Sequence, residues 1–239
     1  MAVSAHPHGN VEAGYQPDVR RAARVRIART TGLWYLAVGV TGMFGFLIVR
    51  PALFAVDDPS ATLAHLLERE ALARVGIALE MGIVMTQALA ALWFFRLFRE
   101  VDSFAAGAIA VFGCINAIAV LVSAAALATA LQVALHPIGA GGEVQLLYLF
   151  SNSLWQVGNL FFGLWLIPMG WCVLRSRWMP VALGRILIVG GVGYVLLPFV
   201  AQLAPGVGAA VAVLPLTATV GEFWMIGYLL VRGVSRTAA

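Results

Sequence analysis

The sequence has no lysine and few charges of any kind. All fifteen basic residues are arginine, and charged residues make up 11% of the 239 positions, against roughly a quarter in soluble domains. Hydrophobic residues make up 62%, and the mean hydropathy is +0.92. So few charges cannot cover a water-exposed surface. The absence of lysine also excludes chemistry that depends on a lysine Schiff base or on a lysine that transfers protons.

Residues that usually hold metals, haem or catalytic nucleophiles are also scarce. The sequence has four histidines, none of them in a segment predicted to span a membrane, and two cysteines, Cys114 and Cys172, which we expect at different depths. It contains no G-x-S-x-G nucleophile motif and no phosphate-binding glycine loop. We therefore expect no metal site and no cofactor.

What the sequence has instead is a series of long apolar segments. A helix needs about 20 mostly apolar residues to cross the hydrocarbon core of a bilayer, and six segments meet this requirement. They are residues 31–49, 73–95, 104–133, 145–173, 181–202 and 207–231. Because backbone polar groups in lipid must be satisfied internally, we predict an all-α fold, a polytopic membrane bundle of six transmembrane helices over residues 31–232.

The arginines indicate how this bundle sits in the membrane. With six crossings, twelve of the fifteen lie on the side of the chain termini, and Arg50, Arg69 and Arg74 lie towards the other side. Basic residues are concentrated in cytoplasmic connections, so the N-terminus and the C-terminus are expected in the cytoplasm. Contact with the lipid bilayer and its anionic headgroups explains the pI of about 9.6, and no nucleic-acid partner is predicted.

The segments outside the spans are short. Residues 1–17 are polar and lack apolar periodicity, which predicts a disordered tail; a basic juxtamembrane segment follows at 18–30, and a second tail at 233–239. Between the first two spans, Asp58-Pro59 has the pattern of a helix start, and leucines follow at helical spacing. This segment is either an amphipathic helix on the outer surface or the extended beginning of the second span.

Polar side chains within the spans are the candidates for function, because a charge near the bilayer centre costs at least about 2.5 kcal/mol. Two carboxylates lie near the middle of the second and sixth spans, and amides recur at helical spacing in the others, which places them on continuous faces. The predicted polar site near the bilayer midplane comprises Glu80, Gln87, Asn116, Asn152, Gln156, Asn159 and Glu222. The alternative for the amides is interhelical hydrogen bonding that serves packing alone.

Two ion pairs are expected. Arg185 lies near the start of the fifth span at a depth similar to that of Glu222, and the short turn after this span makes the fifth and sixth helices neighbours. Arg185 is therefore the expected partner of Glu222. Arg74 lies four residues after Glu70, the spacing that favours an ion pair on one helix.

Small and aromatic residues have the positions expected in a membrane bundle. Aromatic residues such as Tyr35 and Trp178 lie near the predicted cytoplasmic boundaries, which suits anchoring at the membrane interface. The glycines that favour close helix approach are Gly39, Gly42, Gly45, Gly190, Gly191 and Gly193.

Short motifs near the ends of the spans resemble one known family. They are Arg74-Val-Gly76-Ile77 with Glu80, Trp178-Met-Pro180 with Leu183-Gly184, and Gly221-Glu222 with Gly227 and Arg232. Across about residues 25–235 the chain resembles a bacterial membrane family known only as domain of unknown function 4386. In that family a basic residue usually follows the proline of the second motif, whereas this sequence has Val181. The resemblance implies six spans in the bacterial cytoplasmic (inner) membrane, and it implies no activity.

Three functional hypotheses remain. The favoured one is a small-molecule or proton-coupled binding or transport protein, with the midplane carboxylates and amides as its site. The second is a structural or interaction protein that forms a homo-oligomer, or assembles with another membrane protein, through glycine-rich helix faces. The third and least favoured is a membrane-embedded enzyme, because the sequence has no recognisable catalytic constellation.

Overall fold

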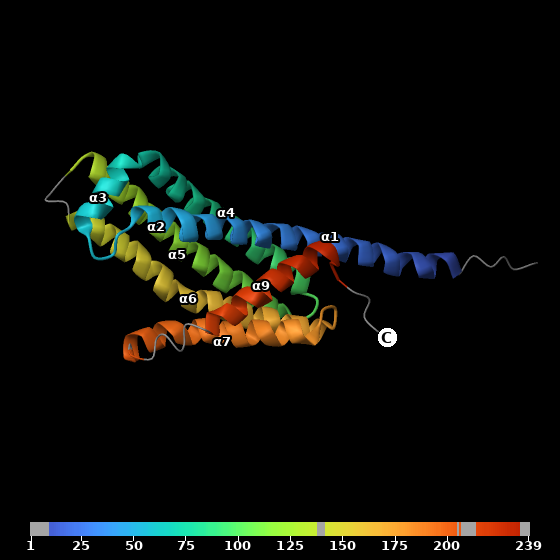
Figure 1. Cartoon of the computed structure of the whole chain (residues 1–239). Coiled ribbons are helices and arrows are strands. Elements are labelled where there is room, and N and C mark those ends of the chain that lie inside the picture. Colours follow the sequence, from blue (N-terminus) through green and yellow to red (C-terminus); the bar gives the residue numbers. More distant parts are fainter. Residues whose placement is uncertain (1–9, 138–141, 205, 207–213, 235–239) are drawn as a thin grey trace, which may run out of the picture.

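The computed structural model describes residues 10–137, 142–204, 206 and 214–234, and within them every regular element is a helix (Figure 1). The elements are α1 (Asn10–Phe44), the π-helical turn η1 (Gly45–Val49), α2 (Arg50–Leu53), α3 (Pro59–Glu68), α4 (Glu70–Phe98), α5 (Ser103–Leu135), α6 (Gly142–Ser176), α7 (Val181–Leu203) and α9 (Leu214–Val231). The all-helical prediction is confirmed for this part of the chain.

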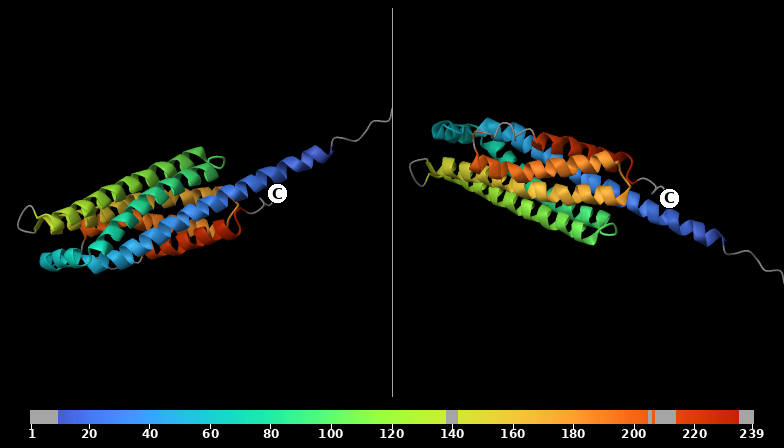
Figure 2. Two further views of the ribbon diagram at one scale, coloured as in Figure 1. Left: turned by 90° about the horizontal axis from the view of Figure 1, so that it is seen from above. Right: turned by 90° about the horizontal axis from the view of Figure 1, so that it is seen from below.

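The long helices form an elongated bundle (Figures 1 and 2). From α4 to α7, each packs against the helix before and after it; α9 packs against α7 and α1, and α1 packs against α4. Six helices therefore close into a ring. Large side chains from α4, α6, α7 and α9, including Phe94, Trp165, Leu187 and Met225, are fully buried within it.

Five helical stretches are long and apolar enough to cross a membrane by length and composition. They are Arg21–Leu53, Glu70–Phe98, Ser103–Leu135, Gly142–Ser176 and Val181–Leu203. A sixth apolar helix, Leu216–Val231, is shorter, and residues 207–213 of the predicted sixth span lie outside the described residues.

Both ends of the described chain lie at the same end of the bundle, opposite α3 (Figure 1). Arg24 lies 3.6 Å from Glu100 after α4, and its guanidinium stacks over Trp178 after α6. Val25 packs beside Gly233, just beyond α9. The arginine-rich start of α1 and two interhelical connections thus meet at this end.

The N-terminal boundary differs from the prediction. Residues 10–17, predicted to belong to a disordered tail, form the start of α1, and the basic segment 18–30 continues into the first span without a break. Extending an existing helix costs far less free energy than nucleating a new one. The polar residues before the apolar segment therefore continue the same helix. Residues 1–9, and the part of the C-terminal tail from 235 onward, lie outside the described residues.

The segment after the first span is a separate short helix, as one of the two alternatives predicted. Asp58 caps α3 by accepting a hydrogen bond from the backbone N–H of Ala61 at 2.9 Å, and Pro59 is its first residue. At Arg69 the backbone leaves the helical region (φ −123°, ψ 41°), which separates α3 from α4. The buried Leu66 lies on the side of α3 that covers this end of the bundle, where α3 contacts α5 and α6.

Glycines bring α6 and α7 into close contact in an antiparallel register. A Cβ on Gly163 would collide with the backbone of Gly191, and a Cβ on Gly170 would lie 2.6 Å from the carbonyl oxygen of Gly184. In both pairs the residue numbers sum to 354, as an antiparallel register requires. Close backbone approach of this kind strengthens helix packing where no water is available to drive association.

We therefore expect Gly163→Ala to destabilise the protein by about 1–3 kcal/mol, the usual cost of overpacking. The two nearest atoms are backbone atoms of α7, which cannot move aside as a side chain can. Thermal unfolding in mild detergent would measure the change. Gly107→Ala in α5 is the matched control, because a Cβ there meets nothing within 4 Å. Equal melting temperatures for the two variants would contradict the close packing of α6 on α7.

At the arginine-rich end, one carboxylate ties the start of α5 to the end of α6. Asp102 accepts hydrogen bonds from the backbone N–H of Ala105 (3.0 Å), the indole Nε1 of Trp171 (3.2 Å) and Nη1 of Arg175 (2.9 Å). The pKa of Asp102 is lowered, chiefly by the Ala105 amide and then by Trp171 and Arg175. These donors favour the ionised form of the carboxylate.

Because the pKa of Asp102 is lower in the folded protein than in the unfolded chain, its contacts stabilise the fold above the ordinary aspartate pKa of about 3.9. This stabilisation is lost as the pH falls through the lowered pKa. We expect Asp102→Asn to reduce the fall in melting temperature between pH 6 and pH 3 relative to the unaltered chain. The exposed Asp57→Asn is the control, and identical pH profiles for all three proteins would contradict the assignment.

Candidate functional site

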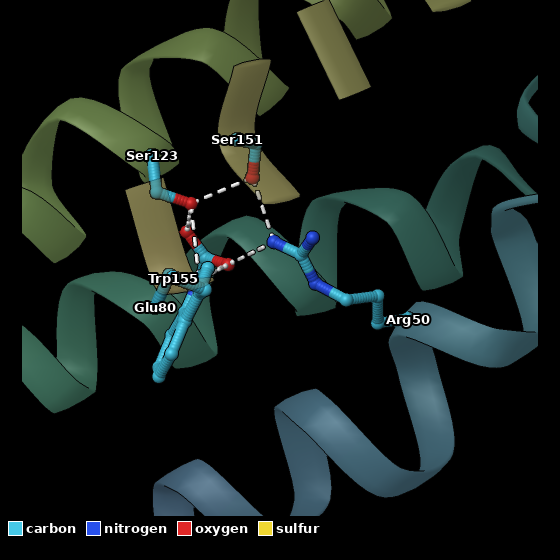
Figure 3. A network of polar contacts seen from close by, with 5 residues as sticks. All are labelled: Arg50, Glu80, Ser123, Ser151 and Trp155. Carbon is cyan, nitrogen blue, oxygen red and sulfur yellow. Dashed lines mark hydrogen bonds and ion pairs between the residues drawn. The ribbon is translucent and has the colours of Figure 1, made fainter. Parts of the chain in front are cut away.

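A network of polar side chains lies inside the bundle, in the half nearer to α3. Arg50 forms an ion pair with Glu80, with Nη2 3.0 Å from Oε1, and the same Nη2 donates to Ser151 Oγ at 2.6 Å. Ser123 Oγ donates to Glu80 Oε2 at 2.8 Å, and Trp155 Nε1 donates to Glu80 Oε1 at 3.1 Å. Figure 3 shows the five side chains converging from four parts of the chain. Both charged side chains therefore lie inside the helical bundle.

The network is almost fully buried. The side chain of Arg50 is 9% exposed and that of Glu80 is 6% exposed. Besides the bond from Arg50, the carboxylate of Glu80 accepts two hydrogen bonds, from Ser123 and Trp155, and the two serine hydroxyls lie 2.7 Å apart. A buried ion pair is stable only when further hydrogen bonds satisfy its remaining atoms, and this arrangement supplies them on the carboxylate side.

The π-helical turn explains why Arg50 points inward. A π turn has one residue more than an α turn, so it rotates the following side chain by about 100° relative to a regular helix. Without it, Arg50 would share a face with Met43, Phe46 and Leu47, which are all exposed on the outside of the bundle. With it, the backbone N–H of Arg50 bonds to the carbonyl of Gly45, and Arg50 faces α4. Pro51 follows directly and cannot continue the hydrogen-bond ladder.

On the guanidinium side, the network is incomplete. Among the described residues Arg50 Nη1 has no hydrogen-bond partner. A cavity of about 20 Å³ lies beside it, lined by Glu80 and Tyr148 among others. This is enough space for one water molecule, which would complete the hydrogen bonding of the guanidinium.

The second carboxylate, Glu222 of α9, has different surroundings. It accepts a hydrogen bond from the hydroxyl of Tyr35 at 2.5 Å and forms no salt bridge within the described residues. Its predicted partner Arg185 is exposed on α7. The expected pair is therefore absent from the described part, because the arginine lies on the outer face of its helix. The predicted pair between Arg74 and Glu70 is present, at 2.6 Å.

Glu222 borders a cavity of about 160 Å³ between α1, α4, α6 and α9. Its described lining is mostly apolar and aromatic: Tyr35, Val38, Gly39, Gly42, Ile83, Trp155, Phe162, Thr219, Glu222, Phe223 and Ile226. Two glycines of α1 leave this space open. A Cβ on Gly42 would meet nothing within 4 Å, and one on Gly39 would meet only Ile226, at 4.0 Å.

The amides do not form one continuous site with the carboxylates. Asn116 and Asn159 line a small void of about 10 Å³ between α5 and α6. Gln87 is fully buried on α4, and neither atom of its amide has a partner among the described residues. Asn152 is half-buried, and Gln156 lies on the exposed side of α6. Of the seven predicted residues, Asn116 and Asn159 share a cavity, whereas Glu80 and Glu222 line two different ones.

Trp155 connects the two carboxylate sites. Its indole Nε1 donates to Glu80, and its ring lines the cavity beside Glu222. The ring also packs against Phe46 at a centroid distance of 5.4 Å. The wall of the larger cavity is therefore held in place by the ion-pair network.

Sequence reasoning missed Arg50, Ser151, Trp155 and Tyr35. The position of Arg50 after the first span predicts it on the outer side, and the position of Tyr35 predicts it at the membrane interface. In the structure Tyr35 is 2% exposed and bonded to Glu222. The available signal was the spacing on α6, where Ser151 and Trp155 are four residues apart and thus share a face.

The fold and the site together define the class of the protein. Helices of membrane-spanning length surround a buried ion pair and a mostly apolar cavity, as in a multi-pass α-helical membrane protein. Within the described residues, no group of three or more His, Cys, Asp or Glu side chains could hold a metal ion.

The chain belongs to the family described as Domain of unknown function (DUF4386), which matches residues 30–233. The resemblance inferred from the sequence motifs is thereby confirmed. No curated protein and no solved structure matches the chain.

Removing one partner of the buried pair leaves the other charge uncompensated, so we expect Arg50→Met and Glu80→Gln each to destabilise the fold by about 3–5 kcal/mol. Replacing both residues with methionine should recover most of this loss, because no buried charge remains. Denaturant unfolding in mixed micelles would give the free energies.

Arg74→Met is the control for the loss of an arginine. It breaks a pair on the surface, where the Arg74 side chain is 63% exposed, and should cost about 0.5 kcal/mol or less. If Arg50→Met proves as mild as Arg74→Met, the ion pair does not hold the bundle together.

Proposed function

We propose that this protein binds a small hydrophobic molecule within the membrane, in the cavity between α1, α4, α6 and α9. The observation that carries the proposal is a space of about 160 Å³ bordered by a single carboxylate, Glu222. An engineered apolar cavity of about 150 Å³ binds benzene. The size of the cavity therefore suits a ligand with about the dimensions of one aromatic ring.

The position of the cavity supports entry from the bilayer. Among its lining residues, Phe223 and Thr219 of α9 are exposed on the outer surface of the bundle. Gly39 and Gly42 reduce the bulk of α1 on the opposite wall. A hydrophobic molecule that has partitioned into lipid could enter here without crossing the tightly packed interface of α6 and α7.

In this proposal the protein lies in the bacterial cytoplasmic membrane, crosses it six times with α9 as the last crossing, and has both termini in the cytoplasm. The concentration of arginines at the end of the bundle where the chain begins and ends supports this orientation. Coupling of ligand movement to a proton would use Glu222, because Glu80 is already paired with Arg50.

The alternative, a protein that assembles with itself or with another membrane protein, has less support from the glycines. Gly191 is covered by Gly163 of α6, and Gly190 by Ala218 of α9. These small residues are used for packing within the chain and leave no open glycine face on this part of α7.

The test is to fill the cavity. We expect Gly42→Leu to abolish saturable binding of single-ring hydrophobic molecules, neutral or cationic, while leaving the melting temperature unchanged or higher, because the new side chain would occupy open space. Binding would be measured by equilibrium dialysis of radiolabelled probes against the protein in lipid nanodiscs, with empty nanodiscs subtracted.

Gly107→Leu is the matched control, since it adds the same side chain to open space on α5, outside the cavity lining. It should leave binding unchanged. Equal binding by Gly42→Leu and the unaltered chain, or no saturable binding of any probe, would refute the proposed site.

A further inference from the structure

We propose that the ligand of this cavity is a lipophilic organic cation, such as a substituted ammonium ion with an apolar body. This inference rests on the proposed function and specifies the chemical class of its ligand. Three observations carry it: the charge balance at Glu222, the aromatic residues of the lining, and the contrast with Glu80.

The first observation is a carboxylate with no cationic partner. Within the described lining of the cavity, Glu222 is the only acidic residue and there is no basic one. Its polar partner Tyr35 is a neutral hydroxyl donor. A carboxylate removed from water is costly unless a positive charge compensates it, and a bound cation would supply that charge.

The second observation is the aromatic content of the wall. Four of the eleven described lining residues are aromatic: Tyr35, Trp155, Phe162 and Phe223. The faces of aromatic rings attract organic cations, and sites that recognise quaternary ammonium groups are built from them. Two of these rings are fixed by hydrogen bonds to carboxylates, Tyr35 to Glu222 and Trp155 to Glu80.

The third observation is that the chain compensates its buried carboxylate, Glu80, with its own side chains. Glu80 has Arg50 and two further donors, and its side chain is 6% exposed. The arginine expected to pair with Glu222, Arg185, is exposed on the outside of α7. Glu80 is thus paired with an arginine of the same chain, whereas Glu222 borders a cavity large enough for a ligand.

The experiment compares a cation with its neutral isostere. Phenyltrimethylammonium and tert-butylbenzene have nearly the same shape and differ in charge. Binding of each to the full chain in nanodiscs is measured by equilibrium dialysis, with empty nanodiscs subtracted. We expect the cation to bind saturably and about tenfold or more tightly than the isostere.

Variants assign the effect to the site. Glu222→Gln should weaken binding of the cation by about thirtyfold or more, as expected when one partner of a desolvated charge pair is lost, and leave the isostere unaffected. Phe223→Leu keeps the carboxylate and should weaken binding of the cation by about two- to fivefold. It provides a second test should Glu222→Gln fail to fold. Glu70→Gln is the control, because Glu70 is a half-exposed carboxylate outside the cavity lining, and it should leave binding of the cation unchanged.

The outcomes separate the two proposals. If the isostere binds saturably and the cation does not, the cavity binds hydrophobic molecules and the inference of a cationic ligand is wrong. If the cation binds but neither Glu222→Gln nor Phe223→Leu weakens it, the inference is also wrong. If neither probe binds, both proposals fail.

Discussion

The ion pair between Arg50 and Glu80 is the interaction on which much of this bundle depends. Two opposite charges lie in an apolar helical bundle, nearly out of reach of solvent, and neither can be left alone without a large penalty. The pair joins the start of α2 to α4, and its further hydrogen-bond partners come from α5 and α6. The register of these helices is therefore fixed by the need to bring five polar side chains together.

That requirement explains two local irregularities near the end of the first span. The π turn at Gly45–Val49 rotates Arg50 from the exposed face of the helix towards Glu80. Gly76 of α4 lies one turn before Glu80, and a Cβ there would lie 2.8 Å from Cγ1 of Val49. The glycine lets α4 approach the π turn closely enough for the pair to form. An irregular turn inside a helix is a frequent feature of functional sites, and here its effect is to place a charge.

The sequence predicts long apolar helices because crossing a membrane requires long, mostly apolar segments, and five of the six predicted segments are found in helices of that length in the described residues. It also predicts α3 and the pair of Arg74 with Glu70, since both depend on residues close together in the chain. It cannot predict that Arg50 faces inward, because the π turn changes the helical period that such reasoning assumes. Nor does it pair Tyr35 with Glu222, which are 187 residues apart. Depth along a helix can be counted, but the direction in which a side chain points depends on packing between helices.

Glu80 and Glu222 therefore have different physical roles. Glu80 is held by a partner of the same chain, and its hydrogen bonds stabilise one arrangement of the helices. Glu222 is held by a neutral tyrosine and borders open space. A charge stabilises a fold most when the same chain provides all its partners. A binding site instead needs a polar group that lacks a partner until the ligand binds. By this criterion the search for a function belongs at Glu222, and the ion-pair network supports it by fixing Trp155 in the wall of the same cavity.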